Sequence, residues 1–98
     1  MDCIAALKAL GEANRLRILR LLLKGELGVN GIAGSVGISQ YNASRHLRVL
    51  REVGFLEIRK QGQQRFYSLT PCLRAHPARN RNILHLDCCT LNFEKLPG

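Results

Sequence analysis

The chain has 98 residues, 46% of them hydrophobic, and its 15 Lys and Arg side chains exceed its 7 Asp and Glu to give a net charge of +8. This length predicts one domain with a modest core, so we expect a homodimer that shares a second core. No segment reaches the roughly 20 apolar residues of a membrane span, and the N-terminus has no signal-peptide pattern, which predicts a cytosolic protein without membrane contact.

The positive charge is clustered, which favours a polyanion such as nucleic acid as the partner. The middle third of the chain holds most of the cluster, and further arginines follow it: Arg45, Arg48, Arg51, Arg59, Lys60 and Arg65, then Arg74, Arg79 and Arg81.

The first quarter of the chain carries two helical patterns. Residues 2–10 place Ile4 and Leu7 on one face and end at Gly11. That apolar face suits a dimer contact, with ordinary packing inside the same subunit as the alternative. Residues 14–24 carry a broad apolar stripe about three turns long, which is typical of a central core helix, and Gly25 is expected to end it.

Two further helical patterns follow, separated by a short turn. Residues 29–36 have apolar side chains at helical spacing, with Asn30 as the expected cap. Residues 37–39 then form a tight connection that contains a glycine. A helix from about residue 40 to 53 follows, capped by Ser39 and stopped by Gly54. A helix, a short glycine turn and a second helix have the spacing of a helix-turn-helix.

The second of these helices has two distinct faces. The apolar side gathers Ala43, His46, Leu47 and Leu50, and we expect His46 to be packed or hydrogen-bonded there. The other side gathers Tyr41, Ser44, Arg45, Arg48 and Glu52. The polar side offers the donors needed for base edges and phosphates in a major groove. A solvated amphipathic helix is the alternative for such a pattern taken alone.

A β-hairpin is predicted directly after this helix. Residues 55–60 and 64–69 alternate apolar with polar side chains, and residues 61–63 form the turn between them. A basic hairpin in this place is the wing of a winged helix-turn-helix, so the fold class is mainly α with a β-hairpin wing. The wing side chains Lys60, Gln63 and Arg65 are suited to phosphate or minor-groove contact.

The pattern weakens after residue 70. Pro71 and Pro77 limit any helix between them to one or two turns, and residues 83–93 alternate well enough to predict a strand. We therefore divide the chain into a DNA-binding domain, residues 1–70, and a C-terminal extension, residues 71–98, which carries a cysteine pair and is a candidate dimer or inducer element.

Three segments of the chain resemble the ArsR/SmtB family of winged-helix bacterial repressors. The residues that carry the resemblance are Leu10-Gly11-Glu12-Ala13-Asn14-Arg15-Leu16-Arg17-Ile18-Leu19, the run from Ser39 to Gly54, and Gly62 to Leu69. The resemblance covers about residues 5–70 and implies a homodimer that sits on a palindromic double-stranded DNA operator and leaves when an inducer binds. By position, it places the base-reading side chains on Gln40, Tyr41, Ser44 and Arg45, where Tyr41 replaces the family's more usual small serine.

Two inducer sites of the family have no counterpart in this sequence. The arsenic-type site resembles Glu-Leu-Cys-Val-Cys, whereas residues 26–30 read Glu-Leu-Gly-Val-Asn and hold no thiol. The zinc-type site needs paired Asp/His and His/Glu residues on a C-terminal helix, and the residues after Thr70 do not offer that spacing.

The four cysteines, Cys3, Cys72, Cys88 and Cys89, are expected to be ligands or redox-active thiols in a reducing compartment. Adjacent cysteines make a strained internal disulfide, and as thiolates they suit As(III), Sb(III) or Cu(I). Some arsenic-responsive members of the family carry such a pair near the C-terminus. Cys72, or Cys3 of the partner subunit, would complete a three-thiol site. The alternative is that Cys88 and Cys89 are small buried hydrophobic side chains.

The sequence therefore predicts a DNA-binding repressor released by a thiophilic metalloid, most simply arsenite, with no organic cofactor. Arg48 would join the wing in contacting phosphates. A thiol-redox-sensing repressor of the same fold and a winged-helix protein-interaction module are the alternatives. No Ser/His/Asp or paired-carboxylate arrangement stands out, so we do not expect an enzyme.

Overall fold

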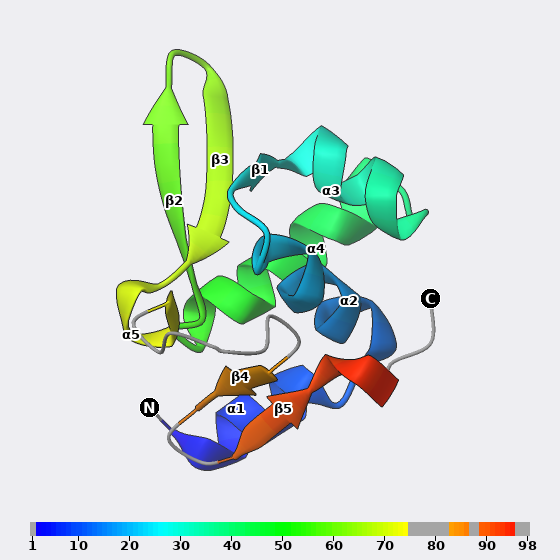
Figure 1. Ribbon diagram of the computed structural model, residues 1–98. Coiled ribbons are helices and arrows are strands. Elements are labelled where there is room, and N and C mark those ends of the chain that lie inside the picture. Colours follow the sequence, from blue (N-terminus) through cyan, green and yellow to red (C-terminus); the bar gives the residue numbers. More distant parts are fainter. Residues whose placement is uncertain (1, 75–82, 87–88, 96–98) are drawn as a thin grey trace.

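The computed structural model describes residues 2–74, 83–86 and 89–95 (Figure 1). Its first half is helical, with α1 (Cys3–Leu10), α2 (Ala13–Leu22), α3 (Val29–Val36) and α4 (Gln40–Glu52). The predicted helices are confirmed to within two residues at their ends. Helix α2 begins one residue earlier than predicted because Glu12 caps it, its side chain accepting a hydrogen bond from the Arg15 N–H.

The helix-turn-helix is built by α3 and α4 and the turn between them. Gly37 ends α3 in the left-handed region at φ +81°, which a glycine adopts without steric cost. The Ser39 hydroxyl then accepts a hydrogen bond from the Asn42 N–H at 3.0 Å and so caps α4. The predicted Asn30 cap is wrong: α3 begins at Val29, directly after Gly28, because Gly28 belongs to a strand that leads straight into the helix.

Three antiparallel strands form the sheet, in the order β1 (Leu27–Gly28), β3 (Gln64–Leu69), β2 (Leu56–Gln61). The predicted hairpin is confirmed as β2 and β3, joined at Gly62 and Gln63, where Gly62 has a φ of +62°. Strand β1 pairs Leu27 with Tyr67 and Gly28 with Phe66. It was not predicted, because two residues are too few to show an alternating pattern.

The described part of the tail contains α5 (Pro71–Arg74), β4 (Ile83–His85), β5 (Thr90–Asn92) and the 3₁₀ turn η1 (Phe93–Lys95). The single strand predicted over residues 83–93 is wrong, because β4 and β5 are two antiparallel strands. The Leu86 N–H donates to the Cys89 carbonyl at 2.9 Å, and Leu84 faces Leu91 across the pair. Apolar residues alternate on each side of the reversal, at Leu84 and Leu86 and again at Leu91 and Phe93, which is why one strand was predicted.

One apolar cluster joins the helices, the sheet and the tail. Ile18 and Leu19 of α2, Leu47 and Leu50 of α4, and Phe55 are completely buried within it. Leu84 and Phe93 from the tail belong to the same cluster. The C-terminal extension therefore adds to the core of residues 1–70 and does not stand apart from it.

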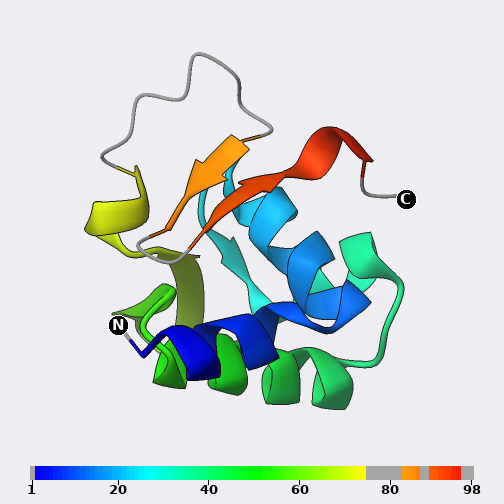
Figure 2. The ribbon, with the colours of Figure 1, turned by 90° about the horizontal axis from the view of Figure 1, so that it is seen from below.

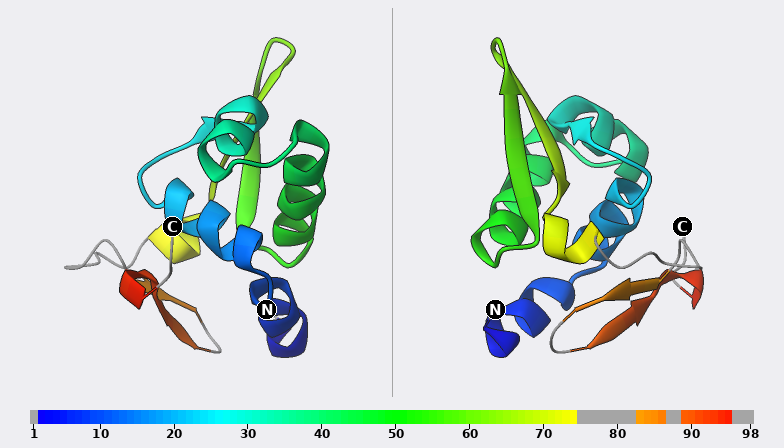
Figure 3. Two further views of the ribbon diagram at one scale, coloured as in Figure 1. Left: turned by 90° about the vertical axis from the view of Figure 1, so that its right-hand side faces the viewer. Right: turned by 60° about the vertical axis from the view of Figure 1, so that its left-hand side comes forward.

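The wing tip and the β4–β5 hairpin lie at opposite ends of the molecule (Figures 1 and 3). Helix α1 lies at the same end as the β4–β5 hairpin, and Figure 2 views the molecule from that end. Within the described ranges, no helix has the length and apolar character needed to cross a membrane.

Candidate nucleic-acid interface

Helix α4 presents one buried and one exposed side, as its sequence predicts. Ala43, Leu47 and Leu50 are completely buried, whereas the Tyr41 side of the helix stands in solvent, with Tyr41 72% exposed. Gln40, Ser44 and Arg45 are exposed on the first turns of the same helix. Burial of the apolar stripe fixes the rotation of α4 about its axis, so the polar side chains must face outward.

Two side chains of this exposed face interact. The Arg45 guanidinium lies over the Tyr41 ring, 5.8 Å from its centroid, which is a cation–π contact one helical turn apart. The contact restricts the rotamers of two long side chains on an exposed surface. Arg45 thus projects in a narrower range of directions than an unassisted arginine would.

Arg48 lies further along α4 and pairs with Glu52 at 3.0 Å. Both side chains are largely exposed, so the pair is worth little in water and can exchange for another anion. Arg48 therefore sits where a phosphate could replace Glu52 as its partner.

The wing carries exposed polar side chains at its tip. Lys60 and Arg65 are directly opposite one another across β2 and β3, and both are exposed, as is Gln63 in the turn. Like charges facing each other across two strands repel. An anion between or beside them relieves that repulsion, which favours a phosphate at this place.

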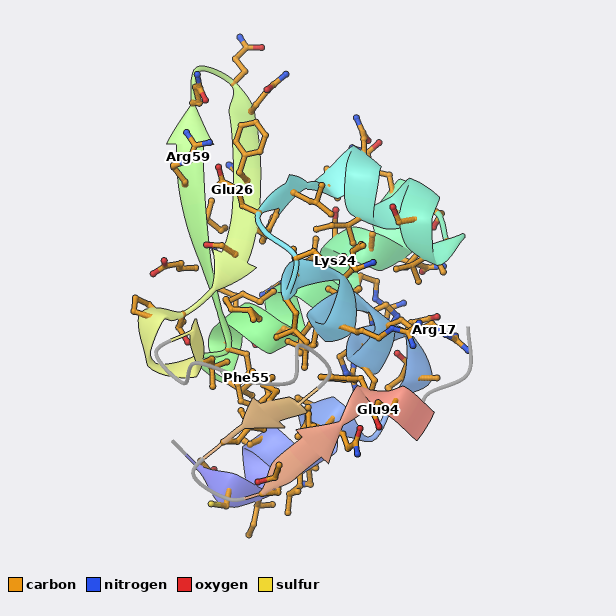
Figure 4. All side chains as sticks on the ribbon, viewed as in Figure 1. Arg17, Lys24, Glu26, Phe55, Arg59 and Glu94 are labelled. Atoms are coloured by element: carbon orange, nitrogen blue, oxygen red, sulfur yellow. The ribbon has the colours of Figure 1, made fainter. Side chains whose placement is uncertain are left out.

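Arg59 belongs to the predicted basic cluster but is bound within the chain. Its guanidinium donates to the Glu26 carboxylate, with Nη2 2.6 Å from Oε1, and lies 4.8 Å from the centre of the Phe66 ring. The hydrogen bond to Glu26 raises the pKa of Arg59 further above its ordinary value. Figure 4 shows Arg59 and Glu26 lying together partway along the β2–β3 hairpin.

His46 lies on the buried flank of α4, as predicted, and faces the start of α2. Its Nδ1 is 3.6 Å from a carboxylate oxygen of Glu12. Burial acts to raise the pKa of Glu12. The backbone hydrogen bonds from Asn14 and Arg15 outweigh it, with smaller contributions from the charges of His46 and Arg15, so the pKa of Glu12 is lowered. Glu12 thereby links the cap of α2 to α4.

The predicted ligand cysteines are only partly described. Cys3 is exposed on α1 and is disulfide-bonded, so in this state it offers no thiolate and departs from the expected free thiol. Cys89 is a free, half-buried thiol that packs against the core. Cys88 and the Cys72 side chain lie outside the described residues. Among the described residues, no group of three or more His, Cys, Asp and Glu is placed to hold a metal ion.

The partners of Arg59, Glu26 and Phe66, are not evident from the sequence. Glu26 is 33 residues away from Arg59 in the chain, and nothing local marks the pair. The one available signal is that Glu26 is an isolated acid between a core helix and a basic hairpin, in a chain with few acids.

A helix-turn-helix with an exposed cationic second helix, followed by a basic hairpin, defines a winged helix-turn-helix DNA-binding protein. Residues 7–57 match the family model described as "Bacterial regulatory protein, arsR family". The chain belongs to the ArsR family of transcriptional regulators and is not an enzyme. This confirms the family predicted from the sequence.

Three relatives illustrate the family. A "Biofilm growth-associated repressor" of Xylella fastidiosa is 38% identical over 84 residues, which are 86% of this chain and 71% of that protein. A "Cadmium resistance transcriptional regulatory protein CadC homolog" of Staphylococcus aureus is 40% identical, over 70% of this chain and 58% of its own. The "Arsenical resistance operon repressor" of Escherichia coli is 42% identical, over 78% and 66%.

Solved structures agree with the fold. HlyU from Vibrio cholerae superposes with a TM-score of 0.66 at 37% identity and covers 74% of this chain and 79% of its own. A homodimeric winged helix-turn-helix DNA-binding domain from Mycobacterium bovis has a TM-score of 0.65 at 36% identity, over 69% of this chain and 64% of that one.

Proposed function

We propose that this chain is a transcriptional repressor that binds a palindromic operator as a homodimer and leaves it when a thiophilic ion binds its cysteines. The observation that carries the proposal is the exposed face of α4, where Tyr41, Ser44 and Arg45 stand in solvent while the opposite face is buried. A helix held in this way can enter a major groove without moving the core.

Base reading is assigned to the first turns of α4. Gln40, Tyr41, Ser44 and Arg45 would contact base edges, with Arg45 donating two hydrogen bonds to a guanine. The contact with Tyr41 supports this role, because an arginine already held in a narrow range of directions loses less entropy on binding. Arg48, Lys60, Gln63 and Arg65 would contact phosphates or the minor groove.

The homodimer is assigned to the apolar face of α1. Ile4 is 68% exposed and Leu7 is 53% exposed, although both are large and apolar. A second copy of the chain would cover them and place two copies of α4 about 34 Å apart, one helical turn of DNA. The solved M. bovis relative is described as homodimeric, which supports the assignment.

The inducer site is assigned to Cys88 and Cys89, with Cys72 or the partner's Cys3 as a third thiol. Each thiol that binds arsenite replaces one hydroxyl, which leaves as water together with the thiol proton. The relatives described as arsenical and cadmium resistance regulators support a thiophilic ion as the inducer. Binding must favour a dimer geometry that no longer fits the operator, since an ion that binds both geometries equally releases nothing.

A redox-sensing repressor is the second candidate, because Cys3 is disulfide-bonded. Two thiols reduce hydrogen peroxide to water and are themselves oxidised to a disulfide, which loses both thiol protons. A bond at Cys3 would tie α1, the proposed dimer helix, to another part of the chain. DNA affinity would then depend on the oxidation state and not on a bound ion.

Operator release separates the two candidates. The fully reduced protein on a fluorescent operator duplex is titrated with arsenite and, separately, with hydrogen peroxide, and release is followed by anisotropy. Release by arsenite that is lost in Cys89→Ser supports the ion-responsive repressor. Release by peroxide alone, lost in Cys3→Ser and reversed by dithiothreitol, supports the redox sensor and excludes the arsenite site.

A further inference from the structure

Arg59 spans the sheet from one edge to the other. It starts on β2, passes over the Phe66 ring on the central strand β3, and ends at Glu26, the residue directly before β1. Its Nε lies 3.2 Å from both carboxylate oxygens of Glu26, and its Nη1 donates to the Gln61 side-chain oxygen at 3.0 Å. We call Glu26, Arg59 and Phe66 the wing strap.

The wing strap sits where the sheet changes from three strands to two. Arg59 is paired with Phe66, and Phe66 is paired with Gly28 of β1. Beyond this row, β2 and β3 continue to the tip with no described third strand, and the next pair is Lys60 with Arg65. A two-stranded ribbon twists and bends more easily than a larger sheet. The orientation of the tip therefore depends on what holds this last three-stranded row.

The wing strap lies on the face of the sheet opposite the cationic pair. Side chains alternate between faces along a strand, so Arg59, Gln61 and Phe66 share one face. Lys60 and Arg65 share the other face with the buried Leu56. The guanidinium of Arg59 is consequently directed away from the side on which Lys60 and Arg65 project.

We infer that Glu26 and Arg59 are positioning residues for DNA binding, which hold Lys60 and Arg65 at the angle needed to meet a phosphate. Arg59 itself does not neutralise a phosphate, although it belongs to the basic cluster. The cation–π contact with Phe66 and the paired donation to one carboxylate restrict the orientation of the Arg59 guanidinium. The inference rests on the proposed function, because it assigns the wing to phosphate contact.

Net charge and the positioning role predict opposite changes in DNA affinity for Glu26→Gln. Loss of a negative charge from a DNA-binding protein should raise affinity by charge alone. The wing strap predicts the reverse, a loss of about fivefold, because the phosphate contacts of the tip are no longer preorganised. Glu57→Gln is the matched control, since Glu57 lies on β2 on the same face of the sheet as Arg59 and the change removes the same charge. We expect it to leave affinity equal or raise it.

Salt dependence separates positioning from contact. Lys60→Gln should flatten the slope of log affinity against log salt by about 0.9, the value for one lost phosphate contact. Arg59→Lys keeps the charge but cannot donate in the same plane, and we expect it to lower affinity about as much as Glu26→Gln, with the slope unchanged. The double variant Glu26→Gln/Arg59→Lys should lose no more than either single variant.

The free protein supplies a readout that does not depend on DNA. Amide relaxation of residues 61–64 in the uncomplexed protein should show greater motion in Glu26→Gln than in wild type or Glu57→Gln, with unchanged melting of the core. The inference is overturned if Glu26→Gln binds as well as Glu57→Gln, or if the slope changes for Arg59→Lys. If wild type shows no operator preference while Glu26→Gln loosens the tip, the proposed function fails and the positioning of the wing by the strap stands.

Discussion

The two ends of the molecule differ in how many of their side chains find partners within the described part of one chain. Toward the wing, Ser39 caps α4, and Arg59 is held by Glu26 and Phe66. At the α1 end, Ile4 and Leu7 remain exposed and Cys3 is disulfide-bonded. At the wing end, contacts within one chain leave Lys60 and Arg65 exposed, where they suit an anion. At the α1 end, the exposed apolar surface suits contact with another protein surface.

The proposed base-reading surface and the proposed dimer surface therefore lie on separate parts of this small fold. The single core, built from α2, α4, the sheet and the tail, holds both ends in place. Variants at each end should therefore change one property and leave the other.

Leu84→Ala should lower the free energy of unfolding by about 2–4 kcal/mol, the usual cost of an empty leucine site in a core. Leu84 is 2% exposed and belongs to the tail, so the loss would show that β4 supports the same core as α2 and α4. Urea unfolding followed by circular dichroism measures it. A loss under about 0.5 kcal/mol, typical of surface substitutions, would mean that the tail does not pack as described.

The double variant Ile4→Glu/Leu7→Glu should weaken the dimer at least tenfold, since it places two charges in the proposed apolar contact. Sedimentation equilibrium across protein concentration gives the dissociation constant. Lys8→Glu is the control, because Lys8 is exposed on the same helix but is not apolar. An unchanged dimer in the double variant would place the interface elsewhere.

Tyr41→Ser should lower operator affinity about twofold to fivefold, because it removes a cation–π contact of about 0.5–1 kcal/mol that holds Arg45. Tyr41→Phe keeps the ring and should retain most of the affinity. Anisotropy titrations on one operator duplex compare the three proteins. Equal loss in both variants would mean that the Tyr41 hydroxyl, and not its ring, carries the effect.

Glu12→Gln should have the smallest effect and should depend on pH. The pKa of Glu12 is lowered from 4.5 in the folded chain, so its ionised form contributes stability above that value. The contribution is lost as the pH falls through the lowered folded pKa. At pH 7 we expect the variant to be less stable by about 0.5–1 kcal/mol, as for other lost helix caps, and at pH 3 the difference should shrink. A difference that is independent of pH would contradict this.

Local signals account for the parts of the fold that were predicted. The apolar spacing of α4, the Ser39 cap and the turn at Gly37 all act within a few residues, so the helix-turn-helix is readable from the sequence. The wing follows from two alternating segments around Gly62. Base contacts, phosphate contacts and thiol ligands remain predictions, because they involve molecules other than this chain.

Long-range contacts account for what was missed. Strand β1 exists because Leu27 and Gly28 lie against β3, and two residues carry no pattern of their own. The wing strap joins residues that are 33 positions apart. The hairpin of β4 and β5 was predicted as one strand, since apolar residues alternate both before the reversal, at Leu84 and Leu86, and after it, at Leu91 and Phe93, and the one-residue shift between the two runs was overlooked.

Operator selectivity tests the central claim most directly. Wild type and Ser44→Ala/Arg45→Ala are titrated, over a salt series, onto a palindromic promoter duplex and a shuffled duplex of the same composition. We predict that wild type prefers the palindrome, and that the double variant loses about 10-fold to 100-fold on the palindrome while it binds the shuffled duplex almost as before. Equal preference for the palindrome in both proteins would contradict base reading by α4, and no preference in wild type would indicate a winged-helix module without an operator.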